Sequence, residues 1–188
     1  MNKIAISLGV ACEAAMYGVN NNLRKRKCDG YMTCPFDEMI SNYNGVIECI
    51  LNDFEGFTDD KNLDIIIAYD NGEKLIKNTK YNFIFNHESF THANLYLSQN
   101  WKEGENHYYN NNYYWFKERY NSRINNFRKY IKEAEYIYFI IDKKDDEISL
   151  LNFTLKLKYP NLKFEIIRIK SNGDEYYNNI NKKLNIKI

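Results

Sequence analysis

The chain has 188 residues, of which 44% are hydrophobic and 16% aromatic, and its 26 basic residues nearly balance its 25 acidic residues. This length and composition exclude a disordered protein and favour a single domain over residues 1–188 with a sizeable core. The formal charge of +1 supplies no field that would recruit nucleic acid or an acidic membrane surface, so neither is expected as a partner.

The first apolar run lies within residues 1–10 and is short, because Ser7 and Gly9 interrupt it. It is typical of a buried strand rather than of a secretion signal, and no run in the chain has the length of a membrane span. We therefore expect a soluble, cytoplasmic protein.

The N-terminal third predicts one strand and two helices. The strand is expected over residues 3–8, and a short helix over residues 11–17 would be closed by Gly18. The basic run 24–27 is interpreted as a solvated loop. Apolar residues at helical spacing then predict a second helix within residues 36–52.

The middle third predicts short strands and a polar excursion. Apolar runs over residues 63–68, 74–77 and 81–85 indicate strands, with a turn signal at residues 70–72 between the first two. Residues 86–112 are polar and contain the three histidines, so they are expected to form an irregular loop over a site.

The last third alternates between helices and strands. Helices are expected over residues 113–135, 146–159 and 174–184, and strands over residues 136–141 and 164–169. Continuous apolar strands between helices are typical of parallel sheets. The predicted fold is α/β, with a central mixed or mostly parallel sheet covered by helices; a papain-like α+β fold is the alternative.

Cys12 is the first candidate site residue, because it follows the Gly9 turn at the point where the first strand gives way to a helix. Backbone N–H groups at a helix N-terminus stabilise negative charge and can lower the pKa of a thiol. The neighbouring carboxylate of Glu13 opposes this effect. The alternative interpretation is a small buried residue without catalytic function.

His87 is the candidate general base, since it follows an apolar strand and thiol chemistry needs an imidazole within hydrogen-bond reach. His92 is a weaker candidate and His107 the weakest. Asp37 is expected to cap the second helix, and it could instead orient a histidine; Asp142 is the other candidate for that task.

Two other features are assigned no chemistry from the residues alone. Arg119 and Arg123 share a helix face and could bind an anion, although ion pairs with surface carboxylates are the more ordinary interpretation. Cys28 and Cys34 are too far apart in sequence for a common zinc motif, so reduced thiols are expected, with no metal or other cofactor.

Several short motifs, in this order along the chain, resemble a family found in bacteria and large DNA viruses that is assigned to the papain-like cysteine peptidases. The motifs are Ser7-Leu8-Gly9-x-x-Cys12, Pro35-Phe36-Asp37, Asn52-Asp53-Phe54-x-x-Phe57, Lys80-Tyr81-Asn82 with His87, and Arg119-Tyr120-x-x-Arg123-Ile124. The resemblance implies that Cys12 is the nucleophile and His87 the base. Three positions depart from the family pattern: Glu38 stands where Trp is usual, Glu88 follows His87 where Asp is usual, and a strand that commonly ends in Arg finishes here at Ile141-Asp142.

The expected function is therefore hydrolysis of a peptide or amide by Cys–His acyl transfer, with Cys12, His87 and Asp37 as the catalytic residues. In a viral source the expected location would be the host cytoplasm. The alternative is a non-catalytic α/β module, or a transferase, that binds an anionic small molecule at the Gly9 turn with help from Arg119 or Arg123.

Overall fold

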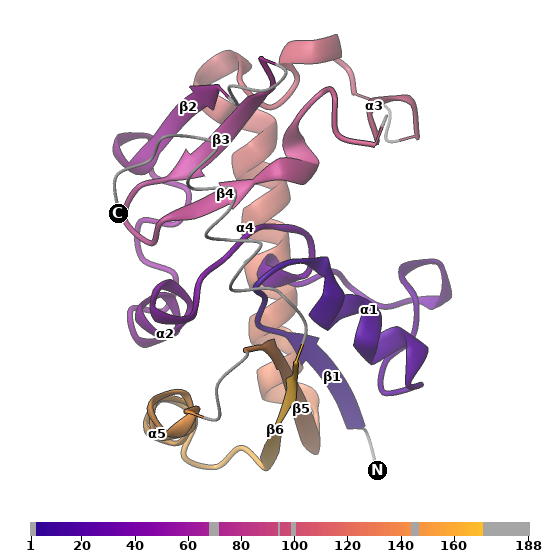
Figure 1. Ribbon diagram of the computed structural model, residues 1–188, viewed down its shortest axis with the longest axis vertical. Helices are drawn as coiled ribbons and strands as arrows, with labels where there is room; N and C mark the ends of the chain where they lie inside the picture. Colours follow the sequence, from indigo (N-terminus) through magenta and orange to yellow (C-terminus); the bar gives the residue numbers. More distant parts are fainter. Residues whose placement is uncertain (1–2, 68–71, 94, 99–100, 144–146, 171–188) are drawn as a thin grey trace.

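The computed structural model describes residues 3–67, 72–93, 95–98, 101–143 and 147–170. Their strands form two three-stranded sheets, one parallel and one antiparallel, at opposite ends of the molecule (Figure 1). The predicted α/β class is confirmed, and the structure adds that the strands divide between two sheets rather than forming one. The predicted helix over residues 174–184 and most of the turn at 70–72 lie outside the described residues.

The parallel sheet has the strand order β1-β5-β6. Its strands are β1 (Lys3–Ser7), β5 (Tyr136–Asp142) and β6 (Phe164–Ile169). The central strand β5 is almost wholly apolar because both of its edges are paired and its side chains enter the core. The sequence pattern predicted these three strands to within one residue at each end.

The antiparallel sheet has the order β2-β3-β4. Its strands are β2 (Leu63–Ile67), β3 (Lys74–Asn78) and β4 (Phe83–Phe85). One further backbone pairing extends it, because Ile40 and Ile84 exchange two hydrogen bonds of 2.8 and 2.9 Å. This bridge attaches the segment before the second helix to β4.

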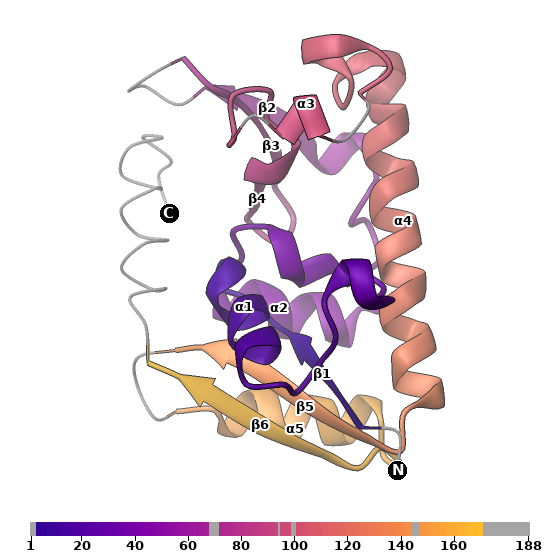
Figure 2. The same ribbon diagram turned by 90° about the vertical axis from the view of Figure 1, so that its right-hand side faces the viewer.

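The long helix α4 (Asn110–Glu133) runs beside both sheets, as two perpendicular views show (Figures 1 and 2). Its first turn is irregular, since Asn111, Asn112 and Tyr113 have positive φ angles of 52°, 53° and 59°. Asparagine tolerates this left-handed backbone better than most residues do. The regular part of the helix therefore begins close to the predicted start at residue 113.

An aromatic core fills the space between α4 and the antiparallel sheet. Phe85 of β4 packs against Phe116 and Tyr120 of α4, with ring centroids 4.7 Å apart in each pair. The same apolar cluster continues to the parallel sheet through residues such as Phe127 and Phe139, which are fully buried. Dispersion and burial of these large rings hold α4 to both sheets.

Two predicted helices differ from the observed ones. The helix α1 (Cys12–Asn20) continues past Gly18, which is buried within it, so Gly18 does not close the helix. The segment predicted as one helix over 36–52 contains the short 3-10 turn η2 (Pro35–Glu38) and then α2 (Tyr43–Leu51). Asn42 caps α2 by accepting a hydrogen bond from the Gly45 N–H, which corrects the expectation that Asp37 would be its N-cap.

The predicted polar excursion over 86–112 is more ordered than a loop where the structure describes it. It contains the 3-10 turns η4 (Asn86–Glu88) and η5 (Gly104–Asn106) and the short helix α3 (Leu95–Ser98). Trp101 and Tyr108 are buried. Its few aromatic side chains therefore attach this segment to the core.

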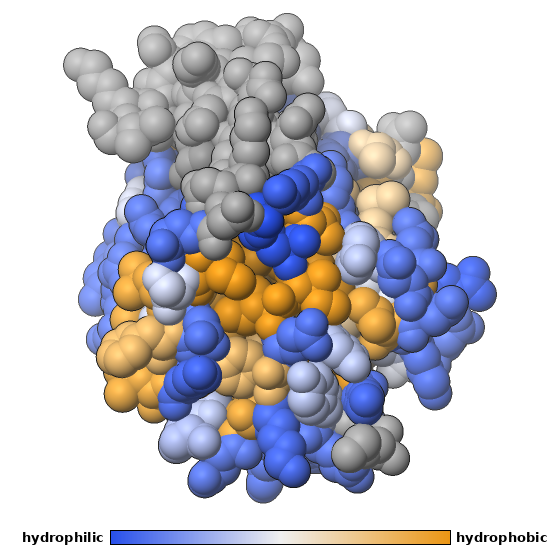
Figure 3. Space-filling model, turned by 60° about the horizontal axis from the view of Figure 1, so that its bottom comes forward, coloured by the Kyte–Doolittle hydropathy of each residue, from blue (hydrophilic) through white to orange (hydrophobic). Residues whose placement is uncertain are grey.

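The end of the molecule that carries α5 (Ser149–Lys158) and the parallel sheet presents apolar surface to solvent (Figure 3). Leu150, Phe153 and Leu157 of α5 are 51%, 64% and 62% exposed. Leu151 and Leu155, on the other side of the helix, are fully buried. In the described residues no helix is both long and apolar enough to cross a membrane.

The turn between β1 and α1 is held by backbone hydrogen bonds on two sides. The Gly9 carbonyl accepts from the Asp142 N–H at 2.8 Å, and the Val10 carbonyl accepts from the Ser41 N–H at 2.7 Å. Gly9 has a φ of +96°, and an added Cβ would lie only 1.9 Å from the Ser41 Oγ. The tight approach of Ser41 therefore requires glycine, and it fixes the place where α1 begins.

Substitution Gly9→Ala is expected to lower the free energy of unfolding by about 2–4 kcal/mol, because it adds a steric clash in a buried turn to the cost of the left-handed backbone. Gly30→Ala is the matched control, since Gly30 also has a positive φ, of +100°, but no atom lies within 4 Å of its added Cβ. Urea denaturation of both variants measures the difference. Equal losses at the two positions would show that the contact with Ser41 is unimportant.

Candidate active site

Cys12 and His87 line the same pocket, which has a volume of about 350 Å³. Its walls come from α1, from the segment between residues 24 and 33, and from η2. Asp37 and Glu38 also line it, whereas His92 and Asp142 do not. The structure thus brings three predicted site residues, Cys12, His87 and Asp37, to one cavity.

Backbone pairing explains how these distant segments meet. The turn before Cys12 is bonded to Ser41, and the adjacent Ile40 is bridged to Ile84 in β4. Strand β4 ends at Phe85, and η4 follows immediately with His87. The two backbone pairings, together with the direct step from β4 to η4, therefore place the turn that carries His87 beside the start of α1.

Cys12 is the first residue of α1 and is partly buried. Burial raises the pKa of its thiol, and the nearby Glu13 carboxylate raises it further. The expectation of a lowered pKa is therefore wrong: loss of hydration and a neighbouring negative charge outweigh the stabilisation offered by the helix N-terminus. In the free protein at neutral pH, Cys12 carries a protonated thiol.

His87 lies in η4 and is also partly buried, and burial lowers its pKa to about 4. The charge of Glu38 acts in the opposite direction, while His92 and the two arginines of α4 reinforce the lowering. The His92 ring lies beside it, with centroids 4.6 Å apart and the ring planes tilted by 39°. His87 is therefore a neutral imidazole at neutral pH, able to accept a proton.

Glu38 faces this pair as a fixed carboxylate. Burial opposes its ionisation, but the guanidinium groups of Arg123 and Arg119 hold its pKa at about 2. Arg123 forms a short ion pair with Glu38, and the Arg119 Nη2 lies 3.1 Å from the same carboxylate oxygen. Glu38, which lines the Cys12 pocket, thus stays ionised, and the two guanidinium groups balance its charge.

Glu88 completes a four-membered cluster with these residues. Its carboxylate is fully buried, 2.8 Å from the Arg119 Nε and 3.7 Å from the Arg123 Nη1, and it accepts a hydrogen bond of 3.1 Å from the Tyr120 hydroxyl. Arg119 and Arg123 therefore do form ion pairs with carboxylates, but within the protein rather than at its surface. The cluster joins η2, η4 and α4.

Asp37 is buried, and its carboxylate is already engaged by other groups. Its carboxylate accepts hydrogen bonds from the Arg24 Nη1 at 2.6 Å and from the Cys34 N–H at 2.7 Å. Burial raises its pKa and the Arg24 charge counteracts this effect. Asp142, the other predicted orienting residue, ends β5 behind the Gly9 turn and is fully buried.

The third histidine, His107, packs against aromatic side chains away from the Cys12 pocket. The His107 ring is stacked between two indoles, with centroids 5.9 Å from Trp101 and 5.4 Å from Trp115. Burial lowers its pKa. These contacts attach the excursion to α4 and place His107 outside the residues that line the Cys12 pocket.

All four cysteines are free thiols: Cys34 and Cys49 are buried, Cys28 is exposed and Cys12 is intermediate. Within the described part of the chain, no group of three or more His, Cys, Asp or Glu side chains could hold a metal ion.

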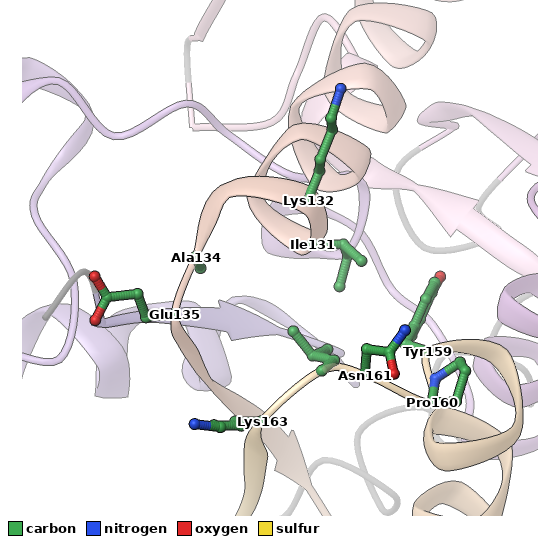
Figure 4. Close-up of a pocket in the computed structure, with 9 residues that line it drawn as sticks. Ile131, Lys132, Ala134, Glu135, Tyr159, Pro160, Asn161 and Lys163 are labelled. Carbon is green, nitrogen blue, oxygen red and sulfur yellow. The ribbon is translucent and has the colours of Figure 1, made fainter.

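A separate pocket of about 410 Å³ lies where α4 ends and the chain enters β6. Figure 4 shows Tyr159, Pro160 and Asn161 on one side of it, and Glu135 and Lys163 on the other. It contains no cysteine, serine or histidine among its lining residues. The Cys12 pocket, whose lining includes a cysteine and a histidine, is therefore the better candidate for an active site.

The Gly9 turn itself offers little room for an anion. Gly9 and Val10 are buried, and Ser41 packs against the turn. Arg119 and Arg123, which were considered for anion binding, neutralise Glu38 and Glu88. These contacts are unfavourable to the alternative of a small-molecule site at this turn.

Glu38 and Glu88 are the site residues that sequence reasoning missed. Both differ from the family pattern quoted above, and each is adjacent to a predicted site residue, Asp37 or His87. Arg119 and Arg123, four residues apart on one helix face, were the sequence signal for the positive charges that pair with these two carboxylates. Only the packing of α4 against η2 and η4 shows that these four charges meet.

The fold and this pocket define an α/β protein with a cysteine, a histidine and a buried carboxylate in one cavity. The chain belongs to the family described as "Putative papain-like cysteine peptidase", whose model matches residues 3–172. The resemblance predicted from the motifs is confirmed. No curated protein and no solved structure matches the chain.

Substitution Arg123→Met is expected to lower the free energy of unfolding by about 3–5 kcal/mol, because it leaves the carboxylates of Glu38 and Glu88 with Arg119 as their one remaining guanidinium partner and so with uncompensated buried charge. The matched control is Arg128→Met, whose ion pair with Asp53 is exposed and is expected to contribute at most about 1 kcal/mol. Guanidinium denaturation near neutral pH measures both. Similar losses in the two variants would contradict the importance of the buried cluster.

The lowered pKa of His87 predicts a defined pH dependence of stability. Between pH 6.5 and about 4 the unfolded chain binds the His87 proton and the folded protein does not, so stability falls as the pH decreases through this window. In His87→Gln this contribution is absent, and the curve is expected to be flatter there. Denaturation at several pH values, with NMR titration of the His87 imidazole, tests this; an unchanged slope in the variant would contradict it.

Proposed function

We propose that the protein is a cysteine hydrolase acting on a peptide or amide bond, with Cys12 as nucleophile and His87 as general base. The observation that carries the proposal is the presence of these two side chains in one pocket. Cys12 comes from α1 and His87 from η4, which are far apart in the sequence. The family description supports a cysteine hydrolase in general terms.

The pKa directions at both residues favour a neutral starting state. Cys12 is a thiol and His87 an unprotonated imidazole at neutral pH. As the sulfur attacks the substrate carbonyl carbon, His87 accepts the thiol proton and then donates it to the departing amine. Water next attacks the resulting thioester, with His87 again as base, and releases the acid while the thiol is restored.

In this proposal, backbone N–H groups at the N-terminus of α1 bind the oxyanion that forms on the substrate. The first N–H groups of a helix lack partners within the helix, and their dipoles point toward negative charge. Because Cys12 is the first residue of α1, these groups are adjacent to its sulfur. In the proposed mechanism they stabilise the tetrahedral intermediate.

We assign the positioning role to Glu38 rather than to Asp37. The charge of Glu38 favours the protonated form of His87, so it stabilises the imidazolium that appears during catalysis. Asp37 instead accepts hydrogen bonds from Arg24 and from the backbone N–H of Cys34. Asp37 then acts on the site indirectly, by holding η2 in place.

Labelling with a peptide that carries a thiol-directed acylating group tests the nucleophile and base. Cys12→Ala and His87→Ala are each expected to lower the labelling rate by at least about 100-fold, the usual contribution of such groups. Cys28→Ser, which removes an exposed thiol outside the pocket, and His92→Phe, which keeps a ring beside His87, are expected to retain labelling. Undiminished labelling of both alanine variants would remove the assignment, and loss in His92→Phe alone would transfer the role of base to His92.

A further inference from the structure

We propose that the Cys12 pocket selects peptides with an acidic side chain near the scissile bond, and that Lys25 and Lys27 bind this side chain. The inference deepens the proposed function and depends on it. Both lysines belong to the basic run 24–27, which the sequence indicated only as a solvated loop, and both line the pocket.

The ion pairs of the pocket do not include these two lysines. Arg24 is paired with Asp37 at 2.6 Å, with side-chain exposures of 8% and 2%. Glu38 is paired with the two arginines of α4. Among the described residues neither Lys25 nor Lys27 makes an ion pair, and both are exposed. The accessible part of the pocket is therefore positive.

The basic run continues away from Cys12. A neighbouring hollow of about 680 Å³ is lined by Arg24 and Lys25 again, and by Lys3 and Arg26. Arg26 is paired with the exposed Asp29 at 2.9 Å. Because Lys25 lines both hollows, an extended acidic peptide could remain in contact with positive charge beyond the site of cleavage.

The helix α1 contributes apolar side chains to the pocket. Ala15, Met16 and Val19 line it, and Met16 is 56% exposed. Glu13 follows Cys12 in α1 but does not line the pocket. A substrate with an acidic residue beside an apolar one fits this lining, since each side chain meets a surface of matching chemistry.

The test uses three peptide probes with the same thiol-directed acylating group, which differ only in carrying Glu, Gln or Lys at the second residue from that group. Labelling of Cys12 is expected to be about tenfold faster with the Glu probe than with the Lys probe, and the ratio is expected to fall at high salt as the charges are screened. In the double variant Lys25→Glu/Lys27→Glu the preference is expected to reverse.

Lys132→Glu/Lys163→Glu is the matched control, because it changes the net charge equally at the separate pocket of Figure 4. It is expected to keep the preference for the Glu probe. Equal labelling of Cys12 by all three probes, or reversal in the control as well, would overturn the inference and leave the proposed function intact. Failure of every probe to label Cys12 would overturn the proposed function and this inference with it.

Discussion

The buried ion cluster of Glu38, Glu88, Arg119 and Arg123 is the constraint on which the arrangement of the site depends. Its carboxylates come from η2 and η4 and its guanidinium groups from α4, so it ties together three elements that are distant in sequence. An unpaired charge in this interior would be costly, and each of the four groups therefore depends on the others for charge balance. The two turns that carry Glu38 and His87 are the same turns that the cluster holds.

This constraint also determines the electrostatics of the proposed chemistry. The arginines keep Glu38 ionised while burial keeps His87 neutral and Cys12 protonated. In the proposed mechanism, charges therefore form on Cys12 and His87 only when the substrate is attacked. The Glu38 carboxylate then faces the newly formed imidazolium of His87. In the proposed mechanism the Glu38 charge stabilises the imidazolium formed in that step, and an interaction gained in the transition state raises the rate rather than tightening binding of the ground state.

Several parts of the fold could be predicted because their signals are local. The continuous apolar runs of β5 and β6 and the three-to-four spacing in α4 each reflect one buried face, and these elements were predicted to within a few residues. The end of α1 was not, because the buried environment of Gly18 overrides its low helix propensity. The division of the strands into two sheets depends on pairings between distant segments, which no local pattern encodes.

The sequence by itself determined the α/β class and the parallel pairing of the late strands, and it named Cys12 and His87 as candidates, since an apolar run, a glycine turn and a strand end are properties of neighbouring residues. Tertiary structure alone decided that these two side chains share a pocket and that Glu38, rather than Asp37, carries the charge facing His87. It also decided the protonation states, because hydration lost on burial and charges approaching from α4 exist only in the folded protein.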